Sequence, residues 1–240
     1  RALQAAVVAL VNRYRALDER LTLALTAMAA VLVFAVGGTV ATLLALGLLG
    51  LLLLLRPELG PPLIVVALPF YQLGVPLLGK AFSMVEILAL MAALGYMVNR
   101  VLAAGFRMPR LTTLDCGVGA LVAAAALSLL WAEHGREAAR EFRTVVLEAG
   151  IFYGLLRAMV AGRRDVWRLA DAWVVGGAII ALVGLVQWAL GQNVITAEGV
   201  WRVRGFYGSP NNLALYLGRV FPLVVAVAAF GGRGEASAFD

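Results

Sequence analysis

The residues of this chain best suited to chemistry lie in one polar stretch, RVRGFYGSPNN, which runs from Arg202 to Asn212 between two long apolar segments. Ser209 suits the N-cap of a following helix, and Pro210 fits its first turn. The free N–H groups of a first turn, together with the positive end of the helix dipole, attract anions. The stretch therefore predicts an anion site, for which phosphate is the most natural ligand.

The side chains around this helix start strengthen the prediction. Gly205 and Gly208 allow close backbone approach and unusual φ angles, while Arg202 and Arg204 supply positive charge and planar donor groups. A capped re-entry turn whose arginines contact anionic lipid is the alternative. The predicted binding residues are Arg202, Arg204, Gly205, Gly208, Ser209, Asn211 and Asn212.

The composition indicates that these residues sit in a membrane protein. The chain is 62% hydrophobic and 14% charged, with a mean hydropathy of +0.92. Repeated apolar runs near the length of a bilayer span are typical of a polytopic helical bundle, and they lack the alternation of a membrane β-barrel. The net charge of +6 comes mostly from arginines at span ends, so we expect no nucleic-acid partner. The single cysteine, Cys116, excludes a Cys-based metal cluster, and no metal site is expected.

The apolar runs predict an all-α transmembrane bundle in one domain, residues 1–240. Residues 1–20 are expected to form an interfacial helix, with a frayed terminus as the alternative. About eight spans follow in residues 21–231, and residues 232–240 form a polar tail. The predicted spans are Leu21–Leu55 (two spans, broken at Gly37-Gly38-Thr39), Leu59–Gly79 (kinked at Pro69), Ser83–Val98, Thr112–Trp131, Phe142–Val160, Leu169–Leu190 and Asn211–Phe230.

The arginine distribution predicts the topology. If both termini are cytoplasmic, most arginines fall on the inner side, as the positive-inside rule expects. The inner segments then contain Arg13, Arg15, Arg20, Arg56, Arg100, Arg107, Arg110, Arg157, Arg163, Arg164, Arg168 and Arg233. RVRGFYGSPNN falls on the outer face, where arginine is normally avoided. A functional requirement for Arg202 explains its presence there.

Two charged residues lie deep inside predicted spans. At about 1.5 Å per residue, Glu148 lies about 9 Å into the sixth span and Arg219 about 12 Å into the eighth. Buried charges in a membrane usually face the bundle interior. We therefore expect an ion pair between Glu148 and Arg219, with a role in a carrier or acceptor cavity as the alternative. Gly150 and Gly154 form a small-xxx-small pair, which is typical of a helix contact.

The chain resembles the O-antigen ligase and O-antigen polymerase-like membrane proteins, both in span order and in one motif. That motif reads Arg-x-x-Gly-x-Phe/Tyr-x-x-Pro-Asn and opens an apolar helix with a proline in its middle. The Trp131-Ala132 end of the fifth span and the RPELG turn are also similar to the family. The matching motif residues are Arg202, Gly205, Tyr207, Pro210, Asn211 and, within the helix, Pro222.

The resemblance implies glycan transfer. Such proteins move a saccharide from an undecaprenyl-diphosphate carrier to a lipid or protein acceptor on the outer face of the cytoplasmic (inner) membrane, and they use no metal or other cofactor. Arg202 would be the catalytic arginine that binds the diphosphate and stabilises the charge of the leaving group. Arg204 has no firm place in the pattern.

The chain also departs from this family. Its members have further spans and a large outer loop that carries a second arginine and a histidine, whereas the single histidine here, His134, lies in a different loop. We therefore expect the N-terminal part of a longer protein, without a complete active site. A lipid-linked saccharide transporter or flippase and a non-catalytic membrane subunit remain the alternatives.

Overall fold

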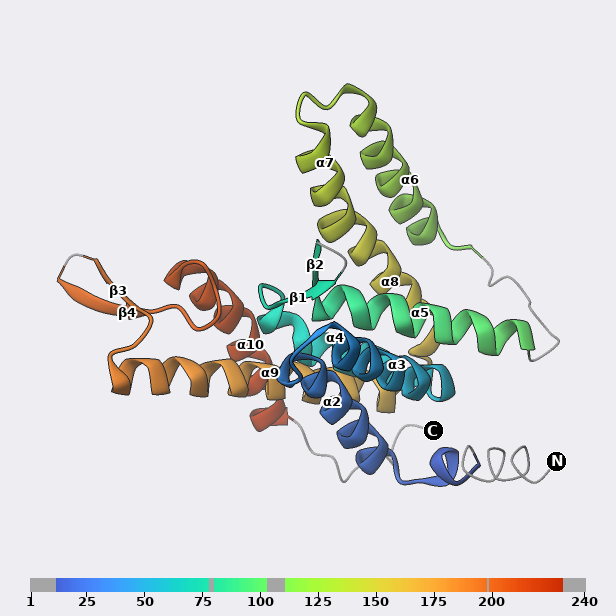
Figure 1. The fold of residues 1–240 in the computed structure, drawn as a ribbon, viewed down its shortest axis with the longest axis horizontal. Helices are drawn as coiled ribbons and strands as arrows, with labels where there is room; N and C mark the ends of the chain where they lie inside the picture. The colour runs from blue at the N-terminus through green and yellow to red at the C-terminus, as the bar shows by residue number, and fades with distance from the viewer. Residues whose placement is uncertain (1–11, 78–79, 103–110, 198, 231–240) are drawn as a thin grey trace. The chain divides into compact units, whose positions relative to one another are not determined.

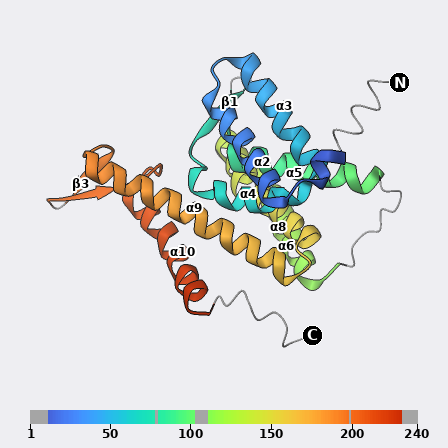
Figure 2. The same ribbon diagram turned by 90° about the horizontal axis from the view of Figure 1, so that it is seen from below.

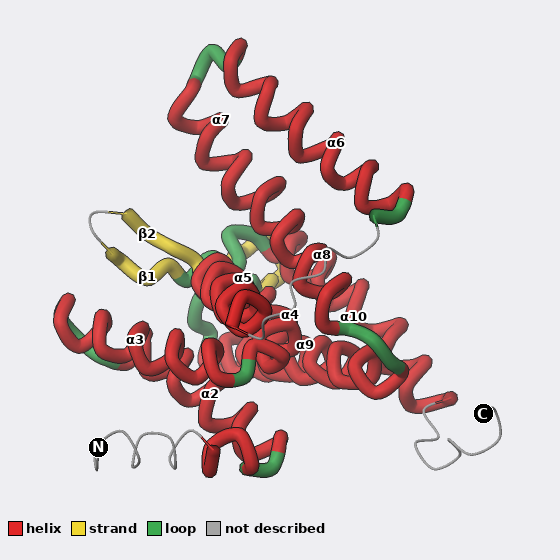
Figure 3. The backbone as a smooth tube through the Cα atoms, turned by 90° about the vertical axis from the view of Figure 1, so that its right-hand side faces the viewer, coloured by secondary structure: helices red, strands yellow, loops and turns green. Residues whose placement is uncertain are grey.

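The computed structural model describes residues 12–77, 80–102, 111–197 and 199–230, and this part of the chain is mostly helical. Figure 3 shows the helices in red and the short strands in yellow. The predicted all-α class is thus confirmed. The chain forms two compact units, residues 1–64 with 74–162 and residues 65–73 with 163–240. Residues 12–16 of the predicted interfacial helix are helical, while its first eleven residues and the predicted tail lie outside the described residues.

The first unit begins with a helical hairpin. Helix α2, Glu19–Ala35, follows Asp18, whose side chain accepts a hydrogen bond from the Arg20 N–H at 2.9 Å. Helix α3, Thr39–Leu55, starts after Gly38, which has a φ of 86° that favours glycine. The predicted break at Gly37-Gly38-Thr39 is therefore confirmed. Figure 2 shows the two helices side by side.

The RPELG turn ends α3 sharply. The turn η1, Pro57–Leu59, and helix α4, Gly60–Ala67, follow with a bend of 107° from α3. Arg56 Nε pairs with Glu58 at 2.9 Å, and Arg56 Nη1 donates to Thr22 Oγ1 at 2.9 Å. This arginine therefore joins the turn to the start of α2.

The prediction that residues 59–79 form one helix kinked at Pro69 is wrong. After α4 the chain forms a 3₁₀ turn, η2, Leu68–Phe70, and then β1, Gly74–Leu77, which pairs antiparallel with β2, Lys80–Ser83. The prolines explain the difference: Pro61 and Pro62 fit a first turn, but Pro69 and Pro76 lack the N–H that a continuing helix needs. An apolar run of membrane length is here divided between a short helix and a strand.

Helix α5, Met84–Leu102, packs against α3 in the first unit. Ser83 precedes it, and its Oγ accepts a hydrogen bond from the Glu86 N–H at 3.0 Å. A Cβ built on Gly95 would lie 2.6 Å from the Leu53 carbonyl oxygen. Asn99 Nδ2 donates to the Leu54 carbonyl at 2.6 Å beside this contact. Glycine therefore allows the two helix backbones to approach closely.

Gly95→Ala is expected to lower the free energy of unfolding by about 1–3 kcal/mol, because backbone atoms of α3 leave no room for a methyl group. The midpoint of thermal unfolding in detergent measures this effect. Gly47→Ala is the matched control, since a Cβ on Gly47 in α3 meets nothing within 4 Å. Equal midpoints for the two variants would contradict the close approach.

A second helical hairpin completes the first unit (Figure 1). Helix α6, Thr113–Ser128, and the turn η3, Leu129–Trp131, run beside a continuous helix made of α7, Gly135–Glu141, the π-helical η4, Phe142–Leu147, and α8, Glu148–Met159. Asp115 joins the two arms: it accepts a hydrogen bond from Tyr153 at 2.6 Å and pairs with Arg157 at 3.3 Å.

Of the small-xxx-small pair on α8, Gly150 lies at a helix contact and Gly154 does not. A Cβ on Gly150 would lie 3.3 Å from a Val122 methyl group of α6, whereas a Cβ on Gly154 would meet nothing within 4 Å. The predicted helix contact is therefore confirmed at Gly150 alone. Helix α6 itself buries none of its residues within the chain.

The second unit is built on two long helices. Helix α9, Arg163–Leu190, begins earlier than the predicted start at Leu169, and α10, Pro210–Phe230, matches the predicted eighth span closely. Glycines of α9 lie where α10 passes: a Cβ on Gly177 would be 2.5 Å from Val220. Strands β3, Val194–Ala197, and β4, Val200–Val203, form a hairpin just beyond the end of α9 (Figure 1).

The described helices support a membrane protein. Four of them, Met84–Leu102, Thr113–Trp131, Arg163–Leu190 and Pro210–Phe230, are long and apolar enough to cross a bilayer, and the bent pair Thr39–Leu55 with Pro57–Phe70 makes a fifth if it counts as one span. Large apolar side chains such as Leu114, Leu121 and Leu130 are exposed. Such exposure suits contact with lipid better than contact with water.

Candidate anion-binding site at the start of helix α10

The β3–β4 hairpin positions Arg202. Arg202 lies opposite Ile195 in the antiparallel register and is exposed. Its neighbour Val203 packs against α9, where a Cβ on Gly184 would lie 3.6 Å from a Val203 methyl group. Because successive side chains of a strand point to opposite faces, Arg202 points away from this packed face.

Arg204 is tied to the base of the hairpin. Helix α9 ends at Leu190, and Gly191 with a φ of 64° and Asn193 with a φ of 52° follow it. Arg204 Nη2 donates to Asn193 Oδ1 at 3.2 Å, and the Arg204 carbonyl accepts from the Tyr207 N–H at 2.9 Å. These two contacts give Arg204 a role in shaping the loop, which the sequence left open.

Gln187 fixes the loop at Gly205 through two hydrogen bonds. Its Nε2 donates to the Gly205 carbonyl at 2.9 Å, and the Gly205 N–H donates to its Oε1 at 2.9 Å. Gly205 has a φ of 61°, and a Cβ there would lie 3.0 Å from Ile180 Cδ1. Both the backbone conformation and the lack of space require glycine. The glycine at 205 is therefore required for packing against α9, while its predicted role in an anion site stays a prediction.

Gly208 differs from this prediction. Its φ is not in the left-handed region, and within the loop from Val203 to Asn212 that region is occupied by Gly205 alone. Gly208 is exposed, and a Cβ there would lie 3.9 Å from the Gln72 side-chain amide. The turn needs one left-handed residue, which Gly205 provides, so the unusual φ predicted for Gly208 is wrong.

The predicted helix start is confirmed. Ser209 Oγ accepts a hydrogen bond from the Asn212 N–H at 3.3 Å, and Pro210 is the first residue of α10. Asn211 and Asn212 in the first turn are exposed. The turn therefore offers its remaining backbone N–H groups and the positive end of the helix dipole to a ligand.

The loop before α10 packs on a cluster of aromatic and aliphatic side chains. Ile180, Tyr207 and Leu213 are buried together, and Phe70 and Phe206 pack against them with ring centroids 5.7 Å apart. Burial raises the pKa of the Tyr207 hydroxyl well above its usual value. Tyr207 therefore stays protonated at physiological pH, as suits a packed aromatic residue rather than a base.

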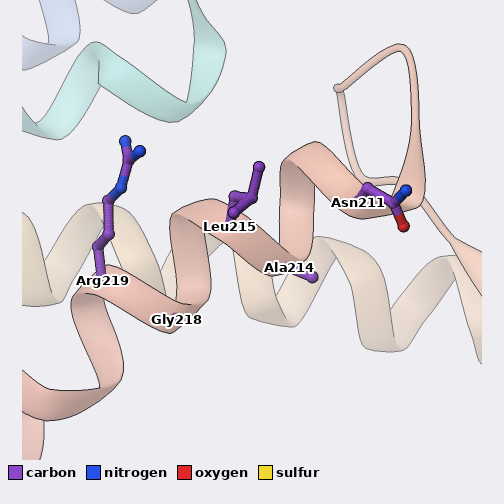
Figure 4. Close-up of a pocket in the computed structure, with 5 residues that line it drawn as sticks. All are labelled: Asn211, Ala214, Leu215, Gly218 and Arg219. Atoms are coloured by element: carbon purple, nitrogen blue, oxygen red, sulfur yellow. The ribbon is translucent and has the colours of Figure 1, made fainter.

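An open groove of about 530 Å³ runs along α10 from its first turn. Asn211, Ala214, Leu215, Gly218 and Arg219 line it, and Figure 4 shows Leu215 and Arg219 extending to the same side of the helix. The two ends of this lining, Asn211 and Arg219, are about 12 Å apart along the helix axis. The groove thus connects the candidate anion site to a second positive charge.

The expected pairing of Glu148 with Arg219 stays a prediction. Glu148 belongs to the first unit, where Glu86 and Arg143 are its charged neighbours. Arg219 belongs to the second unit and lines the groove on α10. For metals, the described residues contain no group of three His, Cys, Asp or Glu side chains able to hold an ion.

Gln187 is the residue of this site that sequence reasoning missed. It is a buried polar side chain near the end of a long apolar helix. That pattern is a usable signal, because a polar group in an apolar segment needs a hydrogen-bond partner. The partner itself, a backbone 18 residues further along the chain, depends on the tertiary fold.

Comparison of the chain with known protein families, with curated proteins and with solved structures gives no match.

Proposed function

We propose that the chain is the N-terminal part of a membrane glycosyltransferase of the O-antigen ligase type. It would transfer a glycan from an undecaprenyl-diphosphate carrier to a lipid or protein acceptor on the outer face of the cytoplasmic membrane, as one step of cell-envelope polysaccharide biosynthesis. The observation that supports this most is the loop before α10, which two Gln187–Gly205 hydrogen bonds and the Ser209 cap fix beside an exposed helix start.

In the proposed reaction the acceptor hydroxyl oxygen attacks the anomeric carbon of the glycan, and the bond from that carbon to the diphosphate oxygen breaks. Negative charge develops on the diphosphate as it leaves. Arg202 and the first-turn N–H groups of α10 would stabilise this charge, and preorganised donors are effective there because they need no rearrangement. The base that takes the hydroxyl proton is assigned to no residue of this chain.

The proposal includes a topology of eight crossings with both termini in the cytoplasm. The arginine bias supports it. The third crossing, over residues 59–79, combines the short α4 and η2 helices with the extended β1 strand. The loop between α9 and α10 then lies on the outer face, where the carrier diphosphate is expected.

Thiol labelling tests this location. In a Cys116→Ser background, Glu198→Cys is expected to react with an impermeant thiol reagent in intact cells, whereas Arg107→Cys and Arg163→Cys react only after permeabilisation. Labelling of residue 107 or 163 but not of residue 198 in intact cells would show that the topology is the reverse of the proposed one and that the candidate anion site is not on the outer face.

The catalytic part of the proposal is tested by measuring glycan transfer by Arg202 variants in the full-length protein.

A transporter of lipid-linked saccharides is the second candidate. The observation that favours it is the bent pair formed by α3 and the segment Pro57–Phe70, because broken helices often line transport sites. Purified full-length protein in detergent, supplied with carrier-linked glycan and acceptor, separates the two functions. Formation of ligated product supports the transferase, since transport has no meaning without a closed membrane.

A further inference from the structure

Residues 70–72, at the end of η2 and just after it, lie beside residues 206–208 of the loop before α10. Pairs of residues meet in order along the two segments: Phe70 with Phe206, Tyr71 with Tyr207 and Gln72 with Gly208. The ring centroids of the two aromatic pairs are 5.7 and 6.0 Å apart. A Cβ built on the glycine would lie 3.9 Å from both the nitrogen and the oxygen of the glutamine amide. The two segments therefore run alongside each other.

The position of residues 70–72 is set by backbone contacts within the second unit, to which residues 65–73 belong. A Cβ on Gly176 of α9 would lie 3.2 Å from the Val66 carbonyl oxygen, so the backbone before η2 touches that helix. The turn after η2 is closed by the Leu73 N–H, which donates to the Phe70 carbonyl at 2.9 Å. Tyr71 and Gln72 are thus held beside the loop from both sides.

Tyr71 and Gln72 form an exposed surface next to the start of α10. Tyr71 packs on Tyr207 with a tilted ring, yet it is 46% exposed, and Gln72 is exposed as well. Gln72 Nε2 donates to the Tyr71 hydroxyl at 3.0 Å, which orients the amide beside the ring. One such bond uses only part of the capacity of an amide, which has two N–H donors and a carbonyl acceptor.

This surface lies within reach of the candidate anion site. Gly208 is two residues before Pro210, the first residue of α10. Since consecutive Cα atoms are about 3.8 Å apart, no more than about 7.6 Å separates the Cα atoms of these two residues. A sugar bonded directly to a diphosphate at the helix start can therefore reach the side chains of Tyr71 and Gln72.

The chemistry of this surface suits a saccharide. The face of an aromatic ring carries partial negative charge, which attracts the C–H groups on one face of a sugar ring. Sugar hydroxyls both donate and accept hydrogen bonds, as a glutamine amide does. Residues 70–72 contain no charged side chain, so a neutral ligand suits them better than a second phosphate group.

We propose that Tyr71 and Gln72 bind the saccharide unit that is attached to the carrier diphosphate, an inference that rests on the proposed function. Tyr71 stacks on the sugar ring, and the Gln72 amide bonds to its hydroxyl groups. The two residues therefore distinguish a carrier that bears a glycan from one that has transferred it. The substrate is held more tightly than the spent carrier, which favours release of the product.

Binding of two ligands by the full-length protein in detergent tests the proposal. One ligand is undecaprenyl diphosphate, and the other is undecaprenyl-diphosphate-linked glycan purified from the cells that make the protein. The wild type is expected to bind the glycan-bearing carrier more tightly. Tyr71→Ala should weaken that binding by about three- to tenfold, the value of one lost aromatic contact, and leave the dissociation constant of undecaprenyl diphosphate unchanged. Gln72→Leu should act in the same direction.

Two further variants are the controls. Tyr71→Phe keeps the ring and its packing on Tyr207, so it should keep the preference for the glycan-bearing carrier. Trp188→Ala removes another exposed aromatic side chain of the second unit, one that is 60% exposed on α9, and should change neither dissociation constant. Unchanged binding of undecaprenyl diphosphate by Tyr71→Ala also shows that this variant keeps its fold.

The outcomes separate this inference from the proposed function. If the wild type binds both ligands equally, or if Tyr71→Ala weakens both equally or neither, the saccharide-binding role is wrong while carrier binding stands. Tyr71 would then support the loop or anchor the chain at the membrane surface, as exposed aromatic residues often do. A wild type that binds neither ligand would overturn the proposed function and this inference with it.

Discussion

Replacing Arg202 by alanine is expected to lower glycan transfer by about 10²–10³-fold, the usual loss when one preorganised donor to a developing charge is removed. Arg202 lies in β4, which is paired with β3 and followed by the loop that Gln187 holds. The substitution is at an exposed position, so the fold should be retained. Transfer by the full-length protein is the measurement, with abundance checked in the membrane fraction.

Arg202→Lys separates charge from geometry. Bidentate recognition of a diphosphate needs the guanidinium plane, so lysine is expected to fail nearly as badly as alanine. Arg204→Ala is the matched control in the same stretch, because Arg204 bonds to Asn193 within the loop and should affect transfer less. Normal transfer by Arg202→Ala at normal abundance would leave the stretch as a helix cap with no catalytic role.

Gln187→Leu is expected to lower the free energy of unfolding by about 2–4 kcal/mol, because the buried N–H and C=O groups of Gly205 both lose their hydrogen-bond partner. Transfer should fall as well, since the helix start is no longer held in place. The midpoint of thermal unfolding in detergent and the transfer rate are the two measurements.

Gln192→Leu is the control for this substitution. Gln192 lies just after the same helix and is exposed; its backbone N–H donates to the Gln187 carbonyl at 2.9 Å, a bond that a side-chain change leaves intact. It should therefore change stability little. If Gln187→Leu is as stable as Gln192→Leu, the two hydrogen bonds do not determine the loop.

The sequence predicts best those elements whose boundaries have a local cause. Gly38 breaks the first apolar run through its positive φ, and Ser209 caps α10 as its residue type indicates. The stretch over residues 59–79 is predicted poorly, because hydropathy alone does not distinguish a helix from a strand of the same apolar character. There the prolines decide, through hydrogen bonds that they cannot make.

The polar contacts inside the bundle were the least predictable part of the fold. Arg143 lies inside the predicted span Phe142–Val160, and it forms an ion pair with Glu86, which lies far earlier in the chain. The Gln187 contact with Gly205 likewise depends on a turn that brings the chain back to α9. In both cases the residue type indicates that a partner must exist, while the partner itself depends on how the helices pack.

Helix α6 has a consequence for the response of the protein to bilayer thickness. With its η3 turn it has 19 residues, about 28 Å at 1.5 Å per residue, against a hydrocarbon core of about 30 Å. Its Thr112 end is anchored by Asp115 to Tyr153 and Arg157, and it buries no residue within the chain. If α6 crosses the bilayer, hydrophobic mismatch in a thicker membrane is absorbed at its Trp131 end, where the tryptophan side chain is exposed, by local thinning of the lipid around that residue.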